Sequence, residues 1–150
     1  MKLAQALTLR KDLQVRMNQL ASRLNDNAKV QEGQEPNEDP YVLLKELDAC
    51  HGEYVAIVNR INLTNTETIV GDRRLGDLVV ERDALIKLVG LKRRFLSEAS
   101  SIVNRYSKTE IVIKSTVNVG QLQAEIDTMA RDIRDRDTRI QELNWTTELL

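Results

Sequence analysis

Two stretches of the sequence, one near each end, place apolar residues at alternating steps of three and four. This spacing keeps side chains on one stripe of an α-helix, and another helix must cover such a stripe. Arg10 and Arg136 each occupy the one slot that the spacing skips. The pattern predicts a mainly α protein, an antiparallel helical bundle or coiled coil of about four helices. The apolar positions are Leu3, Ala6, Leu13, Met17, Leu20 and Leu24, and then Leu122, Ile126, Met129, Ile133, Ile140 and Leu143.

The first two helices have recognisable ends in the sequence. The first is expected over residues 3–24, followed by turn-forming residues. Asp39 can cap the second helix, and Pro40 suits its first turn. We expect this helix to fade at the polar cluster of residues 62–66. Its buried face is predicted to comprise Leu43, Leu47, Cys50, Tyr54, Ile57 and Ile61.

The third and fourth helices are expected in the second half of the chain. The third begins near Leu75 and continues towards Asn104, with Gly90 as a candidate bend. Asn118, with Gln121 three residues later, resembles the capping box that starts a final helix. The buried candidates of the third helix are Leu78, Leu85, Leu88 or Val89, Phe95 or Leu96, Ala99 and Ile102.

Two short segments predict a β excursion within this helical chain. From Glu110 to Val119, β-branched apolar residues alternate with polar ones, which indicates a strand. Thr66 to Val70 is the second candidate strand, closed by a turn at Gly71 and Asp72. Because a two-stranded ribbon alone is marginal in water, the first segment needs support from the second or from another subunit.

Length, charge and cysteine content narrow the class of protein. At 150 residues, the chain is expected to form a single helical domain spanning residues 1–150. Its net charge of −1 gives no general attraction to nucleic acid or to an anionic membrane. The longest apolar stretch, Tyr54 to Val58, is far shorter than the roughly 20 residues of a membrane-spanning helix. With Cys50 as its single cysteine, we expect a cytoplasmic protein without a membrane span or a nucleic-acid partner.

The sequence contains few residues that could support catalysis or bind a metal, and their spacing does not suit either role. Cys50 and His51 are neighbours on a predicted helix, so they point about 100° apart and cannot face each other as nucleophile and base. His51 is the single histidine, which leaves Asp48-x-x-His51 as only half of a di-iron motif. We therefore expect no catalytic residue, no metal and no cofactor, and an enzymatic role is not favoured.

Four segments of the sequence carry a resemblance to a known family. They are VQEGQEPNEDP at residues 30–40, RINLTNTE at 60–67, RYSKTEI with STVNV between 105 and 119, and RIQELNWTTEL at 139–149. On these segments, the chain resembles a family of short, functionally uncharacterised bacterial helical proteins, some of which carry the label septicolysin. The resemblance implies no established reaction or substrate, whereas the label implies a pore-forming cytolysin.

Polar residues gather at the joints between the predicted helices, and joints on a rigid scaffold often carry recognition. If the helices are antiparallel neighbours, the loop with Gln31 and Glu32 lies at the same end as Arg105, Tyr106 and Glu110. These five residues form the candidate ligand-binding pocket. Two alternatives stay open: the charged members form a simple ion-pair cluster, or the polar residues of the joints only cap helices.

Three functions compete at this point. The leading one is a homo-oligomeric helical interaction or structural protein, assembled through the helix seams and the segment from Glu110 to Val119. The second is a small-ligand-binding protein or enzyme that uses the polar joint residues. The third is a septicolysin-like pore-forming cytolysin, which the label alone suggests.

Overall fold

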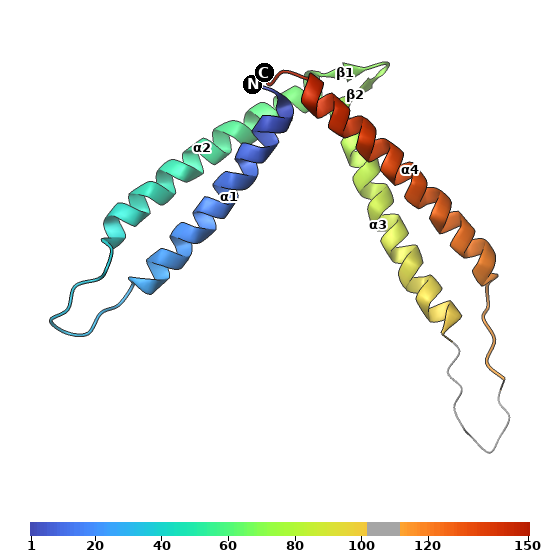
Figure 1. Cartoon of the computed structure of the whole chain (residues 1–150), viewed down its shortest axis with the longest axis horizontal. Helices are drawn as coiled ribbons and strands as arrows, with labels where there is room; N and C mark the ends of the chain where they lie inside the picture. The colour runs from blue at the N-terminus through green and yellow to red at the C-terminus, as the bar shows by residue number, and fades with distance from the viewer. Residues whose placement is uncertain (102–111) are drawn as a thin grey trace. The chain divides into compact units, whose positions relative to one another are not determined.

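The computed structural model describes residues 1–101 and 112–150. Its elements, in chain order, are α1 (Leu3–Asp26), α2 (Pro40–Glu67), β1 (Ile69–Val70), β2 (Arg73–Arg74), α3 (Leu75–Ser100) and α4 (Val119–Thr146) (Figure 1). The predicted fold class, four helices with a short β excursion, is confirmed. The chain divides into two compact units, unit 1 with residues 1–76 and 141–150, and unit 2 with residues 77–140. That the whole chain acts as a single domain stays a prediction.

Unit 1 is built on an antiparallel hairpin of α1 and α2, which lie side by side (Figure 1). The Gln14 amide donates to the Tyr54 hydroxyl at 3.2 Å, and Arg23, further along α1, pairs with Glu38 just before α2. A residue further along α1 therefore contacts a residue earlier in the sequence around α2. This order shows that the two helices are antiparallel.

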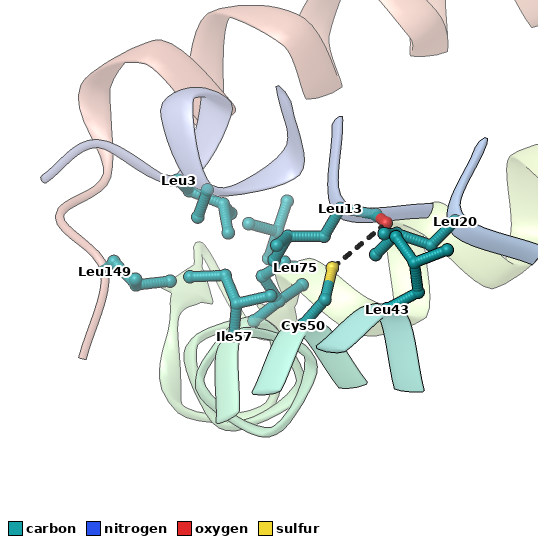
Figure 2. Close-up of a cluster of buried hydrophobic side chains, with 10 residues drawn as sticks. Leu3, Leu13, Leu20, Leu43, Cys50, Ile57, Leu75 and Leu149 are labelled. Atoms are coloured by element: carbon teal, nitrogen blue, oxygen red, sulfur yellow. Dashed lines mark hydrogen bonds between the residues drawn. The ribbon is translucent and has the colours of Figure 1, made fainter. Parts of the chain in front are cut away.

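The core of unit 1 follows the predicted apolar stripes. Leu3, Ala6, Leu13 and Leu20 of α1 are buried against α2, so this seam is covered within the chain. Figure 2 shows Leu75 and Leu149 in the same cluster, together with a hydrogen bond from the Cys50 thiol to the Leu13 carbonyl (3.6 Å). The predicted α2 face lies in this core, with Leu43, Cys50, Ile57 and Ile61 buried and Leu47 and Tyr54 packed against them.

The segment after α4 fastens unit 1 at the beginning of the chain. The Leu3 amide donates to the Thr147 carbonyl (2.9 Å), and the Leu149 amide donates to the Met1 carbonyl (2.8 Å). Between them, the Glu148 carboxylate accepts the Lys2 ammonium at 2.7 Å and the Met1 amino group at 3.1 Å. This short antiparallel bridge holds Leu149 in the core.

The predicted caps are present at the starts of α2 and α4, whereas the end of α2 differs from the prediction. The Asp39 side chain accepts the Tyr41 amide (2.9 Å), and the Asn118 side chain accepts the Gln121 amide (3.0 Å). However, α2 does not fade at residues 62–66 and continues to Glu67. Within the helix, the threonine hydroxyls of the polar cluster bond to carbonyls four residues earlier, as Thr64 does at 2.8 Å, so they do not end it.

The β excursion is a hairpin of β1 and β2, so the strand predicted from Thr66 to Val70 is observed only over Ile69–Val70, and Thr66 and Glu67 belong to α2. Ile69 pairs with Arg74, and Val70 pairs with Arg73. The predicted turn is confirmed, and Gly71 adopts a φ of +68°, which favours glycine.

The strand predicted from Glu110 to Val119 is wrong over its described part. Residues 112–118 are irregular, and Val119 already belongs to α4; Glu110 itself lies outside the described residues. Local bonds override the β-branched pattern: the Ser115 hydroxyl bonds to the Val117 carbonyl (3.1 Å), and Asn118 caps α4.

Unit 2 is a second antiparallel hairpin, formed by most of α3 and α4. Across the two helices, Arg82 pairs with Asp137 at 2.8 Å, whereas Lys92, further along α3, pairs with Glu125, earlier in α4, at 3.8 Å. The helix α3 runs unbroken through Gly90. The core of unit 2 contains buried Val89, Leu96 and Ile126, with Val119, Leu122, Met129 and Ile133 packed against them.

Candidate functional site

The five residues of the predicted pocket are only partly described. Gln31 and Glu32 lie exposed in the loop between α1 and α2. Arg105, Tyr106 and Glu110 lie outside the described residues. The pocket as a whole therefore stays a prediction.

The loop between α1 and α2 contains a shallow polar depression of about 390 Å³. Gln31 contributes to its wall, and the Gln34 amide donates to the Gln31 carbonyl (3.0 Å) to close a tight turn around Gly33, whose φ is +83°. The full lining comprises Asp26, Asn27, Lys29, Val30, Gln31, Gln34, Glu35, Pro36 and Asn37.

Asn27 fixes the shape of this loop. Its side chain is buried; the amide donates to the Arg23 carbonyl (2.9 Å) and its oxygen accepts the Glu38 amide (2.9 Å). Beside it, the Arg23 guanidinium pairs with Glu38, and this hydrogen bond holds the pKa of the Glu38 carboxyl below its ordinary value. The depression is therefore a fixed polar surface that can offer amide and carboxylate groups to a small ligand.

A second polar cluster lies in unit 2, where the apolar seam of α4 is interrupted by Arg136. Arg136 pairs with Glu81 of α3 (3.0 Å) and with Asp132 of its own helix (2.8 Å). One residue on, Arg82 pairs with Asp137 (2.8 Å), so the two helices exchange ion pairs in both directions. Burial lowers the pKa of Arg82, but its bonds to aspartates outweigh burial and leave the pKa raised.

Beside these ion pairs lies a depression of about 290 Å³. Its wall combines two apolar side chains with two aspartates and two arginines. Because Arg136 is already paired with Asp132 and Glu81, the arrangement is suited to joining helices, and it presents no activated nucleophile. The lining comprises Leu78, Asp132, Asp135, Arg136, Arg139 and Ile140.

The Cys50 thiol and the His51 imidazole do not form a catalytic pair. Cys50 is buried with its thiol bonded to the Leu13 carbonyl, whereas His51 is exposed. Within residues 1–101 and 112–150, no three His, Cys, Asp or Glu side chains gather as a metal site would need. Among the described helices, none combines the length and the apolar character that crossing a membrane requires.

Large apolar side chains are exposed along much of the described chain. Among the described residues, nineteen large apolar side chains are exposed, whereas fifteen apolar residues are buried. On α3, the prediction left open whether Leu88 or Val89, and Phe95 or Leu96, face the core. Val89 and Leu96 are buried, and Leu88 and Phe95 are exposed. Sequence reasoning missed this exposed face, although the adjacent apolar pairs were its signal.

Comparison with known proteins places the fold in a family. A crystal structure of a functionally unknown conserved protein from Corynebacterium diphtheriae is 38% identical in sequence and superposes with a TM-score of 0.94, covering 100% of this chain and 99% of that one. No curated protein matches the chain. Residues 10–149 match the family described as "Family of unknown function (DUF6847)". The chain therefore belongs to this family of unknown function.

Proposed function

We propose that the protein is a homo-oligomeric helical interaction protein, whose biochemical role is to present helix faces to further copies of the same chain. The observation that carries this proposal is the exposed apolar face of α3. Val80, Leu88, Leu91 and Phe95 are each between 43% and 67% exposed. Large exposed apolar patches typically mark interaction sites.

The arrangement of the helices explains why such a face needs a partner. Each unit is based on a two-helix hairpin, and a hairpin covers only the side of each helix that faces the other. The two predicted seams are already used in this way, Leu13 and Leu20 in unit 1 and Ile126 in unit 2. Assembly through these seams is therefore not favoured, and the outer face of α3 takes their place in the proposal.

Sedimentation velocity over a broad dilution series tests this function. We expect a species larger than the 17.1 kDa chain at high concentration, which dissociates on dilution. Glutaraldehyde crosslinking at the same concentrations provides an independent readout. A protein that sediments as a monomer at every concentration would contradict the proposal.

A small-ligand site in the loop between α1 and α2 is the second candidate, since the depression there has a fixed polar wall that includes Gln31. A ligand that binds only the folded state raises the melting temperature. We therefore expect a panel of polar metabolites to contain a stabiliser of the wild type that does not stabilise Gln31→Ala. Leu63→Ala, at an exposed position of α2 outside this lining, is the matched control.

A further inference from the structure

We infer that the outer face of α3 binds the same face of a second copy of this chain, with the two helices antiparallel and related by a two-fold axis near residues 87 and 88. This inference rests on the proposed function and specifies the surface through which it acts. The face consists of Val80, Ala84, Leu88, Leu91 and Phe95, here called the α3 stripe. These five positions fall within an arc of about 80° of the helix surface.

The α3 stripe faces largely away from the buried face of α3 and is distinct from it. Val80 is 67% exposed, Leu88 43%, Leu91 57% and Phe95 49%, whereas Val89 in the core is 2% exposed. The stripe is thus available on the surface of unit 2, away from the seam with α4. Its length, about four turns of helix, is sufficient for a helix-to-helix contact.

The spacing of the α3 stripe is symmetric about its centre. Val80 and Phe95 are equally far from the midpoint between residues 87 and 88, and so are Ala84 and Leu91. In an antiparallel pair, the small side chain Ala84 therefore lies against Leu91 of the second copy, and Val80 lies against Phe95. In a two-fold contact, the same surface of both copies forms the interface, so that surface must be complementary to itself. The symmetric spacing of the stripe meets this requirement.

The charges along α3 select the antiparallel direction. Glu81, Arg82 and Lys92 pair with α4. The charges that can act across the contact are therefore those beside the stripe, with the acidic Asp83 before its midpoint and the basic Arg94 after it. An antiparallel partner brings Asp83 of one copy near Arg94 of the other, and a parallel partner sets like charges together. Complementary charges of this kind determine the partner and its direction.

One charged pair across the contact can be named. Asp83 and Arg94 flank the α3 stripe on the same side, and in the antiparallel pair Asp83 lies roughly 3 Å along the axis from Arg94 of the second copy. The Asp83 side chain is half exposed while it accepts Arg82, so a second donor can reach it. Lys87 of both copies lies near the axis, where its flexible stem allows the ammonium group to reach solvent.

Charge reversal tests this geometry. We expect Asp83→Arg and Arg94→Glu each to weaken self-association at least about tenfold, because each sets like charges together. The double variant restores the attraction with reversed signs, and so does an equimolar mixture of the two single variants. Arg93→Glu, which changes the charge equally on the opposite side of the helix from the stripe, leaves self-association unchanged.

An apolar pair of variants provides a second readout. Leu91→Ser, within the α3 stripe, weakens self-association, whereas Ile86→Ser, at a similarly exposed position outside it, does not. Circular dichroism and the melting temperature verify that each variant folds. If the wild type self-associates and neither Arg94→Glu nor Leu91→Ser weakens it, this inference is wrong while the proposed function stands. If the wild type is monomeric throughout, both are wrong.

Discussion

Units 1 and 2 are both based on antiparallel helical hairpins, but different interactions hold their helices together. Unit 1 buries ten core residues and is fastened by the segment after α4. Among its described residues, unit 2 has a core cluster of three buried side chains, and ion pairs join α3 to α4. Burying a large apolar side chain contributes about 1.5–3 kcal/mol, whereas an exposed ion pair contributes about 1 kcal/mol or less. The comparison indicates that unit 2 has less internal support and more surface available for a partner.

The largest contrast between the units is expected from truncation of their cores. Leu43→Ala in unit 1 leaves a cavity among fully buried neighbours and should cost roughly 2–5 kcal/mol of unfolding free energy. Val89→Ala in unit 2 removes less apolar volume and should cost about 1.5 kcal/mol. Urea denaturation measures both values, and an equal or larger loss for Val89→Ala would contradict the difference between the units.

A polar residue of unit 1 should matter nearly as much as a core residue. Asn27→Ala removes the side chain that bonds to the Arg23 carbonyl and to the Glu38 amide, so these partly buried backbone groups lose hydrogen bonds at a cost of about 1–3 kcal/mol. Asn37→Ala, in the same loop but with an exposed side chain, should stay within about 0.5 kcal/mol of wild type. Similar values for the two variants would show that Asn27 does not fix the loop.

Two glycines, one in each unit, should respond to alanine with opposite signs. Gly90 lies inside α3, and a methyl group there meets no described heavy atom within 4 Å, so Gly90→Ala should stabilise the protein by about 1 kcal/mol. Gly33 has a φ of +83°, and Gly33→Ala should destabilise the protein by about 1 kcal/mol. Thermal denaturation of the two variants measures the signs. A destabilised Gly90→Ala would contradict the open space around this position.

The ion pairs of unit 2 should give a smaller and salt-sensitive effect. A double-mutant cycle of Arg82→Ala and Asp137→Ala should yield a coupling of about 1 kcal/mol or less, since both side chains are partly exposed. The coupling should decrease in high salt because mobile ions screen the pair. A coupling that salt does not change would indicate a more enclosed pair than the structure has.

The smallest effect is expected from the bridge that closes unit 1, and it depends on pH. The Lys2 ammonium and the Met1 amino group hold the pKa of Glu148 below its ordinary value of 4.5. The resulting stabilisation is present above pH 4.5 and is lost as the pH falls through the lowered pKa of the folded state. The melting temperature of Glu148→Gln should therefore lie below that of wild type at neutral pH and converge with it in acid. A gap that is constant with pH would contradict this assignment.

Local signals in the sequence predicted the helices better than they predicted the surfaces between them. Asp39 and Asn118 marked helix starts because a cap depends only on its near neighbours. The strand predicted from Glu110 failed over residues 112–118 because β-branched alternation does not reveal the local bonds of Ser115 and Asn118.

Other features could not be predicted from the sequence because they depend on contacts between distant parts of the chain. Leu88 and Val89 are adjacent apolar residues, so periodicity alone could not decide which of them faces α4. Arg136 was visible as an interruption of its seam, but its partner Glu81 lies 55 residues away on another helix. The candidate pocket was predicted as five residues, of which the described loop contains Gln31 and Glu32.

The most direct test of the account is a disulfide crosslink across the proposed axis on α3. Leu88→Cys places a thiol close to its own copy in an antiparallel pair, whereas in Phe95→Cys the two thiols are roughly 22 Å apart along the axis. The wild type, whose single Cys50 is buried, is the control. We predict that mild oxidation converts Leu88→Cys to a covalent dimer and leaves Phe95→Cys without an intermolecular disulfide. Equal crosslinking of both variants, or of neither, would contradict the antiparallel contact between α3 stripes.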